Sequence, residues 1–331
     1  MKFLVIGGAG YIGSHFVYEA ISQSHECVVY DNLSRGHRWA VPEGVPFIED
    51  DILNGDRLSE VLQKFQPDVV LHYAALALVG ESVAEPELYY RNNASGVKVL
   101  LDAIVRTGRK IPVVFSSTCA VFGTPEKLPI SEDDRKAPIS PYGRSKLMAE
   151  FMLEDYCKAY GLKAMALRYF NACGGHSEGK TGELHEPESH LIPNVIQALL
   201  QEKPLTVFGK DFPTDDGTCV RDYIHVTDLA VSHIKAAQYL QEANEGLFDV
   251  CHLGTGNGYS NLEVIKTTEK IIGKEAKFTF GEPRPGDPAK LFADNKKAQD
   301  ILDFKPAHSS LENIITTAIN WEKNKHKVIE G

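Results

Sequence analysis

The sequence lacks a long hydrophobic run, an excess of basic residues and closely spaced cysteine pairs. Its longest apolar stretch, residues 69–79, is interrupted by His72 and is too short to span a membrane. The formal net charge of -10 disfavours nucleic acid and anionic membranes, because both attract basic surfaces. The six cysteines contain no C-x-x-C pair, so neither a zinc ribbon nor a disulfide framework is expected. We therefore expect a cytoplasmic protein with no nucleic-acid or membrane partner.

Short runs rich in Val and Ile alternate with amphipathic segments through the first half of the chain. Strands without polar alternation are typical of a parallel sheet that is covered on both faces. The fold class that this order predicts is α/β, a Rossmann-type doubly wound parallel sheet. The pattern predicts strands at residues 2–6, 27–30, 46–49, 69–73, 112–116 and 163–169, and helices at 11–22, 55–65, 86–107 and 142–160.

The pattern changes after residue 171. Residues 173–190 are rich in Gly, Glu, His and Ser, which predicts a long irregular loop. We assign residues 1–172 to a Rossmann domain, to which later segments return, and residues 173–331 mainly to a smaller mixed α/β substrate lobe. Apolar periodicity in that lobe predicts helices at 192–201, 227–241, 261–273 and 311–324, and strands at 205–208 and 247–252.

The stretch GGAGYIG, residues 7–13, joins the first predicted strand to the first predicted helix. It reads as G-x-G-x-x-G from Gly8 or as G-x-x-G-x-x-G from Gly7. In the second register, Gly7 permits a tight turn, Gly10 lets the backbone approach a pyrophosphate, and Gly13 lets the helix lie against the strand. The free N–H groups of the helix then face the phosphates, which predicts a dinucleotide cofactor.

Polar residues at the strand ends favour NAD over NADP. Asp31, followed by Asn32, ends the second strand and places a carboxylate where the adenosine ribose hydroxyls would lie. A carboxylate there repels the 2′-phosphate of NADP. Residues after the third and fourth strands are also expected to contact the cofactor, namely Asp51, Ile52, Tyr73 and Ala74.

A catalytic group is predicted in SPYGRSK, residues 140–146. Tyr142 and Lys146 are four residues apart on a predicted helix, so both side chains project from one face. A nearby ammonium favours the phenolate of a tyrosine that otherwise titrates near ~10, which yields a general base. Thr118 ends the fifth strand, where its hydroxyl is placed to bond both Tyr142 and a substrate hydroxyl. We therefore predict a proton relay of Thr118 and Tyr142, assisted by Lys146.

Characteristic motifs follow one another along the chain. In order, they are GGAGYIGSH, VGESV, YYRNN, FSSTCAVFG, SPYGRSKLMAE, LRYFNACG, DGTCVRDYIHVTDLA, HLGTGNGYS and RPGD. With these motifs, the chain resembles the extended short-chain dehydrogenase/reductases, and within them the UDP-glucose 4-epimerases, from Met1 to Trp321. The resemblance implies tightly bound NAD that is used without net consumption.

The resemblance also implies a mechanism and a set of contacts. Tyr142 removes the proton of the sugar 4-hydroxyl while the hydride passes to NAD, the 4-ketose turns over, and the hydride returns to the other face. Lys146 also holds the nicotinamide ribose. The implied cofactor contacts include Tyr11, Ile12, Asn92 and Phe170, besides Tyr142 and Lys146. The implied substrate contacts are Thr118, Tyr142, Asn171, Leu191, Val207, Phe208, Arg221, Arg284, Asp287 and Leu291.

Leu291 departs from the family pattern in a way that concerns specificity. Counting from RPGD, it occupies a position where some family members carry a bulky Tyr beside the sugar. The smaller side chain leads to the hypothesis that UDP-N-acetylglucosamine and UDP-N-acetylgalactosamine are also substrates. Two other departures are Ala77, where some members have Lys, and Phe122, which replaces a frequent Tyr.

Other activities remain alternatives. A 4,6-dehydratase needs an acid and a base after the strand-end Thr, but this chain has Cys119 and Ala120 there. A UDP-glucuronate 4-epimerase, or another nucleotide-sugar enzyme of the family, stays open, although no extra basic residue is evident for a sugar carboxylate. From a different class, a non-catalytic regulator that senses NAD(H) would have no need of the relay residues.

We expect no metal site and, from the family resemblance, a homodimer. His185, Glu188 and His190 lie in a polar loop without regular spacing, so no metal site is expected. The family resemblance implies a homodimer, formed through helices at residues 93–107 and 146–160. Both segments carry the apolar stripes that such a contact needs, although the same stripes would also serve an intramolecular core.

Overall fold

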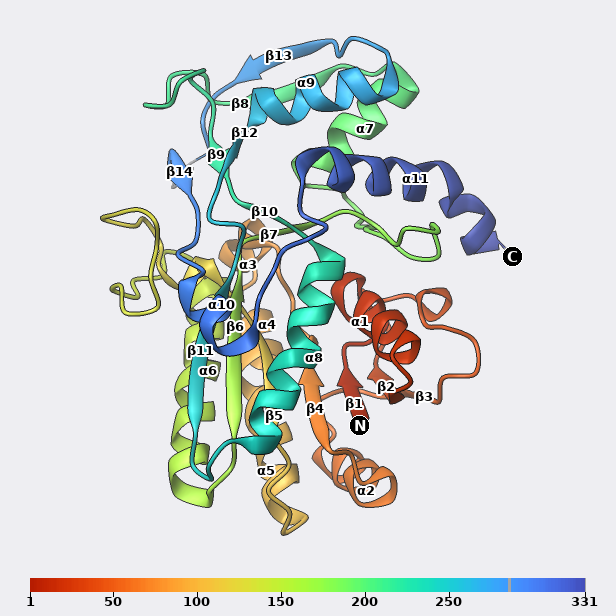
Figure 1. Cartoon of the computed structure of the whole chain (residues 1–331), viewed down its shortest axis with the longest axis vertical. Helices are drawn as coiled ribbons and strands as arrows, with labels where there is room; N and C mark the ends of the chain where they lie inside the picture. The colour runs from red at the N-terminus through yellow and green to blue at the C-terminus, as the bar shows by residue number, and fades with distance from the viewer. Residues whose placement is uncertain (285–286, 331) are drawn as a thin grey trace.

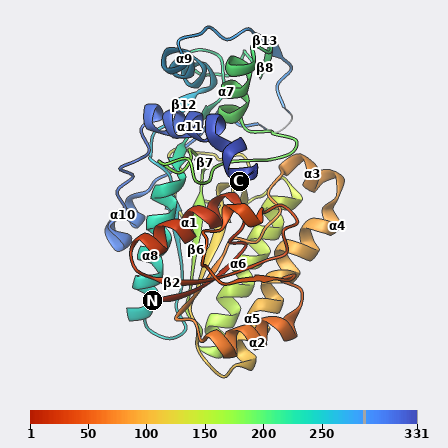
Figure 2. The ribbon, with the colours of Figure 1, turned by 90° about the vertical axis from the view of Figure 1, so that its right-hand side faces the viewer.

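The computed structural model describes residues 1–284 and 287–330, so Pro285 and Gly286 of the RPGD motif lie outside the described residues. The chain forms a large lobe built on one sheet and a smaller lobe at the carboxyl ends of its strands (Figure 1; Figure 2). Within the described part of the chain, no helix combines the length and apolar character needed to cross a membrane.

The large lobe contains seven parallel strands in the order β11-β6-β5-β4-β1-β2-β3. This sheet confirms the predicted Rossmann-type fold. The reversal of strand order lies between β1 and β4, where open α/β sheets bind their ligands. The strands are β1 (Lys2–Ile6), β2 (Glu26–Asp31), β3 (Phe47–Glu49), β4 (Val69–His72), β5 (Val113–Thr118), β6 (Ala164–Tyr169) and β11 (Phe248–Leu253).

Helices cover both faces of this sheet (Figure 2). The strands β4, β5 and β6 are buried throughout. This burial explains why most of their residues are apolar and do not alternate with polar ones. On one face, α1 (Tyr11–Ser22) and α8 (Val226–Glu242) pack together over a core that includes Val5 and Val29. On the other face, α2 (Gly55–Phe65), α5 (Gly96–Arg106) and α6 (Pro141–Tyr160) pack over a core that includes Leu4 and Val28.

The helix predicted at residues 86–107 is not continuous. It consists of α4 (Pro86–Tyr89), a π-helical turn (Tyr90–Ser95) and α5, and it is preceded by the unpredicted α3 (Val79–Ala84). In the π-helical turn, Asn93 is buried and its amide bonds the backbone N and O of Leu76 and the hydroxyl of Ser145. These tertiary bonds cannot be read from helical periodicity.

The smaller lobe combines helices with several short strands. The helices are α7 (Leu191–Gln201), α9 (Asn261–Ile272) and α11 (Leu311–Glu330). Of the strands, β8 (Leu205–Phe208) was predicted, and it pairs with β13 (Phe278–Gly281), which was not predicted. The others escaped prediction because two or three residues carry no periodicity: β7 (Asn171–Cys173), β9 (Val220–Arg221), β10 (Tyr223–His225), β12 (Tyr259–Ser260) and β14 (Lys290–Leu291).

Three short elements complete the fold. These are two 3-10 turns, Arg38–Ala40 and Cys119–Val121, and α10 (Lys296–Leu302), which packs on α8 and β11. The stretch predicted as a loop, residues 173–190, holds only the end of β7 and an isolated bridge between Gly175 and Gly182.

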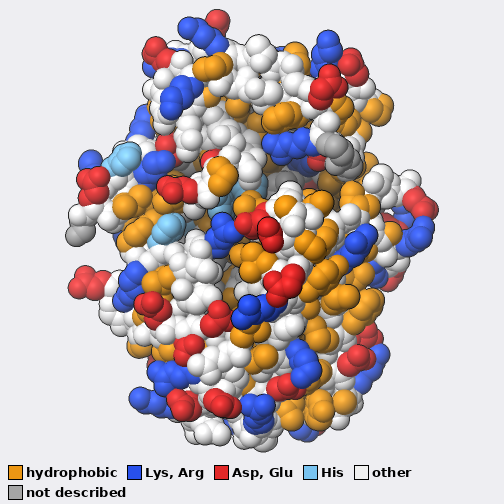
Figure 3. Space-filling view, turned by 180° about the vertical axis from the view of Figure 1, so that it is seen from behind, with side chains coloured by type: hydrophobic (Ala, Val, Ile, Leu, Met, Phe, Trp, Pro, Cys, Tyr) orange, Lys and Arg blue, Asp and Glu red, His pale blue; other side chains and the backbone are white. Residues whose placement is uncertain are grey.

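Exposed hydrophobic side chains gather on one flank of the large lobe (Figure 3). The helices α3 and α4 both pack against α6, and all three expose large apolar residues. We call these residues the α3/α6 patch. Its members are Val79, Val83, Leu88, Met148 and Phe151, of which Val83 and Phe151 are 65% and 55% exposed.

Candidate active site

A cavity of about 970 Å³ lies where the carboxyl ends of the sheet strands meet the smaller lobe. The glycine turn, the end of β5 and the start of α6 form its walls on the side of the large lobe. Residues of α7, β8 and β9 line it on the other side. It brings together Gly7, Gly10, Tyr11, Ile12, Gly13, Tyr73, Thr118, Tyr142, Lys146, Phe170, Asn171, Leu191, Val207, Phe208, Arg221, Arg284 and Asp287, all predicted site residues.

The glycine turn fits the register that begins at Gly7. Gly7 has a φ of +81°, and a Cβ there would lie 2.3 Å from the backbone N of Ala74. A Cβ on Gly13 would lie 2.2 Å from the carbonyl oxygen of Gly7. Gly10 precedes α1 and carries no side chain to cap it, and Gly10 to Gly13 line the cavity. The first N–H groups of α1 are therefore available to an anion such as a pyrophosphate.

The predicted adenosine contacts lie outside the cavity wall. Asp31 is buried, and its carboxylate accepts hydrogen bonds from the backbone N–H groups of Ala9 (2.9 Å) and Leu33 (2.8 Å). Burial raises the pKa of Asp31, although both hydrogen bonds act in the opposite direction. Asn32 donates to the carboxylate of Asp51 at 3.0 Å. Six predicted cofactor contacts are not among the described residues that line the cavity, namely Asp31, Asn32, Asp51, Ile52, Ala74 and Asn92.

Local capping positions Tyr142 at the cavity. Ser140 accepts a hydrogen bond from the backbone N–H of Gly143 (3.2 Å), and Pro141 occupies the first helical position, so α6 begins there. Tyr142 consequently lies in the first turn of α6, half-buried in the cavity wall. Its ring also contacts that of Tyr89, with the centroids 6.4 Å apart.

Thr118 and Lys146 lie beside Tyr142. The Thr118 hydroxyl accepts from the backbone N–H of Ala120 at 3.1 Å, so its own proton remains available to donate. Lys146 is buried and donates to the carbonyl oxygen of Ser116 at 2.7 Å. The structure thus brings the three predicted relay residues together at one wall.

The pKa values of this group differ from the sequence-based expectation. Burial raises the pKa of Tyr142 to about 12, although its hydrogen bond with Thr118 acts in the opposite direction. Burial also lowers the pKa of Lys146 to about 7, against the opposing effect of Glu150. In the protein without cofactor, burial therefore acts against the charged form of Lys146 and against the lowering of the Tyr142 pKa that we predicted.

A buried ion pair supports Lys146 and was missed at the sequence level. Glu150 is one turn after Lys146, and its two oxygens accept from Nε (2.9 Å) and Nη2 (2.6 Å) of Arg168. The hydroxyl of Ser117 donates to the same carboxylate. Both side chains of the ion pair are almost completely buried. Glu150 and Arg168 come from different elements, so only the fold reveals the pair.

Cationic and aromatic groups from the smaller lobe enter the cavity opposite the relay. Arg221 donates to the carbonyl oxygens of Val220 (2.9 Å) and Pro288 (2.8 Å). The guanidinium of Arg284 stacks over the ring of Phe208, 4.5 Å from its centroid. Asp287 lies 3.4 Å from Arg221 Nη2. This arrangement fits a diphosphate next to a planar base, because arginine forks bind phosphate oxygens.

Two other predicted substrate contacts have mainly structural partners. Asn171 donates its side-chain amide to the carbonyl oxygen of Asp222 at 2.9 Å while also lining the cavity. Leu291 is half-buried and packs against a cluster that includes Phe122 and Phe170. Leu291 is not among the described residues of the cavity wall.

Arg35 is a cavity residue that sequence reasoning overlooked. It lines the cavity near the glycine turn and forms an ion pair with Glu81 of α3. No motif marks it, because its role depends on the loop after β2 folding back over Ala9.

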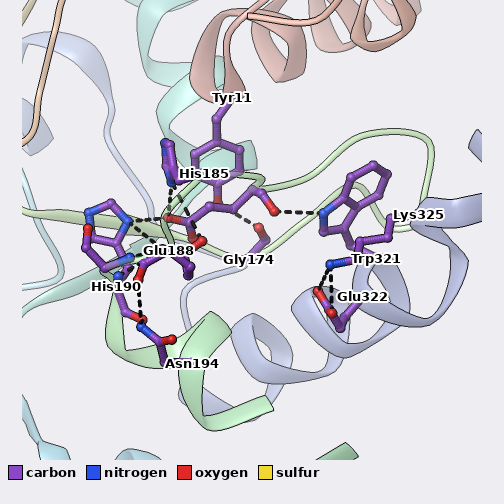
Figure 4. Close-up of polar contacts among 11 residues, drawn as sticks. Tyr11, Gly174, His185, Glu188, His190, Asn194, Trp321, Glu322 and Lys325 are labelled. Atoms are coloured by element: carbon purple, nitrogen blue, oxygen red, sulfur yellow. Dashed lines mark hydrogen bonds and ion pairs between the residues drawn. The ribbon is translucent and has the colours of Figure 1, made fainter. Parts of the chain in front are cut away.

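Two acidic and two histidine side chains meet in the loop before α7 (Figure 4). Glu183, His185, Glu188 and His190 each offer a ligand atom, and these atoms lie within 4.8 Å of one another. Burial alone would lower the pKa of His185, but the carboxylates of Glu183 and Glu188 outweigh it and raise the pKa to about 10. We expected no metal here because His185, Glu188 and His190 lie in a loop without regular spacing, and Glu183 was not among the residues considered.

Comparison with known proteins assigns the chain to a family. The model of the "NAD dependent epimerase/dehydratase family" matches residues 3–251. The UDP-glucose 4-epimerase of Lactobacillus helveticus is 44% identical over 331 residues, covering 100% of this chain and 99% of its own.

Two solved structures are similar throughout. The UDP-glucose 4-epimerase of Brucella ovis in complex with NAD is 47% identical, with a TM-score of 0.92 over 96% of this chain and 97% of its own. The UDP-glucose 4-epimerase of Bifidobacterium longum in complex with NAD+ and UDP is 34% identical, with a TM-score of 0.92 over 99% of this chain and 100% of its own. Fold, cavity and sequence therefore agree that the chain belongs to the NAD dependent epimerase/dehydratase family.

Proposed function

We propose that the protein interconverts UDP-glucose and UDP-galactose at C4 with the help of bound NAD. The observation that carries this proposal is the position of Thr118, Tyr142 and Lys146 at one wall of a cavity. The same cavity contains the free N-terminus of α1 and, opposite, Arg221 and Arg284. Membership of the family and full-length similarity to UDP-glucose 4-epimerases support the same activity.

The residues of this chain fit the cofactor and handle the proton. The backbone of the glycine turn and the N-terminus of α1 hold the pyrophosphate, and Asp31 favours NAD over NADP. When bound, NAD supplies the acceptor and then the donor of the C4 hydride. Tyr142 takes the proton of the 4-hydroxyl and later returns it.

Thr118 and Lys146 assist Tyr142 in different ways. Thr118 donates its proton to the phenol oxygen, and the lone pair that the N–H of Ala120 leaves free accepts from the sugar 4-hydroxyl and orients it. Lys146 is fixed by the carbonyl oxygen of Ser116 and directs its remaining N–H donors toward the nicotinamide ribose. Lys146 is buried and Tyr142 is half-buried, which limits the access of water to these bonds.

The smaller lobe holds the UDP group. Arg221 and Arg284 bind the diphosphate, and Asp287 binds the uridine ribose, while Phe208 and Leu191 contact the uracil. Hydrogen bonds to two carbonyl oxygens fix the guanidinium of Arg221. Little side-chain entropy is therefore lost when the ligand binds.

The residues after Thr118 disfavour a dehydratase. Cys119 stands where that reaction needs an acid or base, and burial raises the pKa of its thiol to about 12. Ala120 has no titratable group. A UDP-glucuronate 4-epimerase, another nucleotide-sugar activity and a non-catalytic NAD(H) sensor remain as alternatives that one assay separates.

The assay measures turnover of a panel of UDP-hexoses without added NAD. We expect rapid interconversion of UDP-glucose and UDP-galactose, and no turnover of UDP-glucuronate. If UDP-glucuronate were the only sugar turned over, the protein would be a UDP-glucuronate 4-epimerase. No turnover of any sugar, with retained NADH binding, would favour the sensor.

We also propose activity on UDP-N-acetylglucosamine and UDP-N-acetylgalactosamine, supported by Leu291 in place of a bulky Tyr. Leu291 packs against the cluster that contains Phe170, and Phe170 lines the cavity, so the size of residue 291 affects the sugar pocket through this cluster. Leu291→Tyr is expected to reduce turnover of the N-acetyl sugars selectively. An equal loss on UDP-galactose would contradict this steric explanation.

We further propose that the protein is a cytoplasmic homodimer. The α3/α6 patch supplies the apolar surface for a contact that buries α6 against its symmetry copy. All six cysteines are free thiols, which agrees with a reducing compartment.

A further inference from the structure

We propose that Glu183, His185, Glu188 and His190 form a zinc site, which we call the Glu183 cluster (Figure 4). The four residues fall within eight consecutive positions of the loop before α7. The site is separate from the relay, and its proposal does not depend on the epimerase activity.

Three of the four separations between imidazole nitrogens and carboxylate oxygens are close to those around a tetrahedral ion. The fourth pair, His190 Nδ1 and Glu183 Oε1, is hydrogen-bonded directly, so these two atoms move apart to admit the ion. Bonds of about 2.0–2.2 Å to zinc place neighbouring tetrahedral ligands roughly 3.3–3.5 Å apart. His185 Nδ1 lies 3.3 Å from Glu183 Oε1 and 3.8 Å from Glu188 Oε2. His190 Nδ1 contacts Glu183 Oε1 and lies 3.6 Å from Glu188 Oε1. Each imidazole therefore faces both carboxylates through the same nitrogen, as ligands around one ion do.

Backbone N–H groups and an indole N–H hold the two glutamates in place. Glu188 Oε1 accepts from the backbone N–H groups of Ser189 (2.8 Å) and His190 (2.9 Å). The carbonyl oxygen of Glu183 accepts from the indole N–H of Trp321 on α11 at 2.8 Å. Glu183 itself is buried. Partners of this kind orient metal ligands and strengthen binding.

The donor set selects zinc over the alkaline-earth ions. Two imidazole nitrogens suit Zn²⁺, whereas Mg²⁺ and Ca²⁺ prefer oxygen ligands. Two carboxylates and two neutral imidazoles neutralise one divalent ion. Four protein ligands leave the tetrahedron closed, which is typical of structural rather than catalytic zinc.

The position of the cluster gives the ion a structural role at the substrate cavity. All four residues line the cavity, and His190 directly precedes Leu191 at the start of α7. The ion would fix the loop against α11 through Trp321 and so fix the N-terminus of α7. Two protonated histidines paired with the same carboxylates would be the metal-free alternative.

Measuring zinc binding to the full-length protein distinguishes a zinc site from a metal-free pair of protonated histidines. The protein is treated with a chelator and dialysed, and Zn²⁺ is then titrated in competition with a chromophoric chelator. Zinc content is measured in parallel by mass spectrometry. His185→Ala and Glu188→Gln each remove one ligand, and His326→Ala, an exposed histidine on α11, is the matched control. Circular dichroism verifies that each variant is folded.

We expect one zinc per chain in the wild type and in His326→Ala. Each ligand variant should bind zinc more weakly by over about tenfold, since even partners outside the coordination sphere cost that much. An anomalous signal at the zinc absorption edge should place the ion among the four side chains in a crystal. Absence of tight zinc binding, equal binding in His185→Ala, or an ion elsewhere would each overturn the proposal in favour of the protonated pair.

Discussion

The buried ion pair between Glu150 and Arg168 offers a quantitative test of how the site is supported. The side chains are 3% and 2% exposed and share two hydrogen bonds of 2.9 and 2.6 Å. Glu150→Gln removes the charge and leaves the Arg168 guanidinium buried without a counter-ion. Breaking such a pair costs about 3–5 kcal/mol. We therefore expect the free energy of unfolding to fall by about that amount.

The same change has a thermal and a functional consequence. An unfolding entropy of about 2.1 cal/mol/K per residue gives the 331-residue chain roughly 0.7 kcal/mol per degree, so Tm should fall by about 4–7 °C. The charge of Glu150 raises the pKa of Lys146 against the effect of burial. Loss of this charge should therefore lower the Lys146 pKa below its present value of about 7. Turnover at pH 7 should then fall and recover partly at lower pH.

The assay is urea unfolding of the wild type, Glu150→Gln, Arg168→Met and the double variant. Because the double variant has no unpaired buried charge, its loss should be smaller than the sum of the single losses by about 1–3 kcal/mol. Additive losses, or a cost of Glu150→Gln below about 1 kcal/mol, would refute the reasoning.

Three further predictions concern the relay, pH and the dimer. Thr118→Val should lower kcat by roughly 10²-fold in a coupled UDP-galactose assay with little change in stability, and an unchanged kcat would remove Thr118 from the relay. In cofactor-free protein, the pKa of Lys146 is about 7 when folded and near ~10.5 when unfolded, so unfolding takes up a proton between these pH values and stability rises with pH across this window. Urea unfolding at pH 7, 8.5 and 10 should show the wild type gaining stability relative to Lys146→Met, and a constant difference would contradict the lowered pKa. Phe151→Glu in the α3/α6 patch should yield monomers in light scattering, and a persistent dimer would place the interface elsewhere.

Elements with strong local patterns were predictable from sequence. The bounds of α1 and α2 match their predicted ranges because each begins after a recognisable turn or cap and has regular apolar spacing. The relay followed from Tyr142 and Lys146 at helical spacing and Thr118 at a strand end, since parallel strands share one carboxyl edge. The register that begins at Gly7 was favoured from the sequence by the Tyr142–Lys146 pair and Thr118, and the positive φ of Gly7 agrees with it.

Features that depend on tertiary contacts were not predictable. The π-helical turn accompanies the amide bonds of Asn93 to Leu76 and Ser145, which are distant in sequence. The pKa of Tyr142 depends on burial, which helical spacing does not report. The Glu183 cluster forms because an irregular loop folds its side chains inward, and periodicity carries no signal for that.

The most direct test of the central claim follows deuterium at C4 of UDP-galactose through turnover, with no NAD added. Because oxidation and re-reduction occur on one bound molecule, we predict that the wild type yields UDP-glucose with the deuterium retained at C4. Tyr142→Phe, which cannot exchange the hydroxyl proton, should be slower by about 10²–10⁴-fold. Loss of deuterium to solvent, or an unimpaired Tyr142→Phe, would contradict the mechanism.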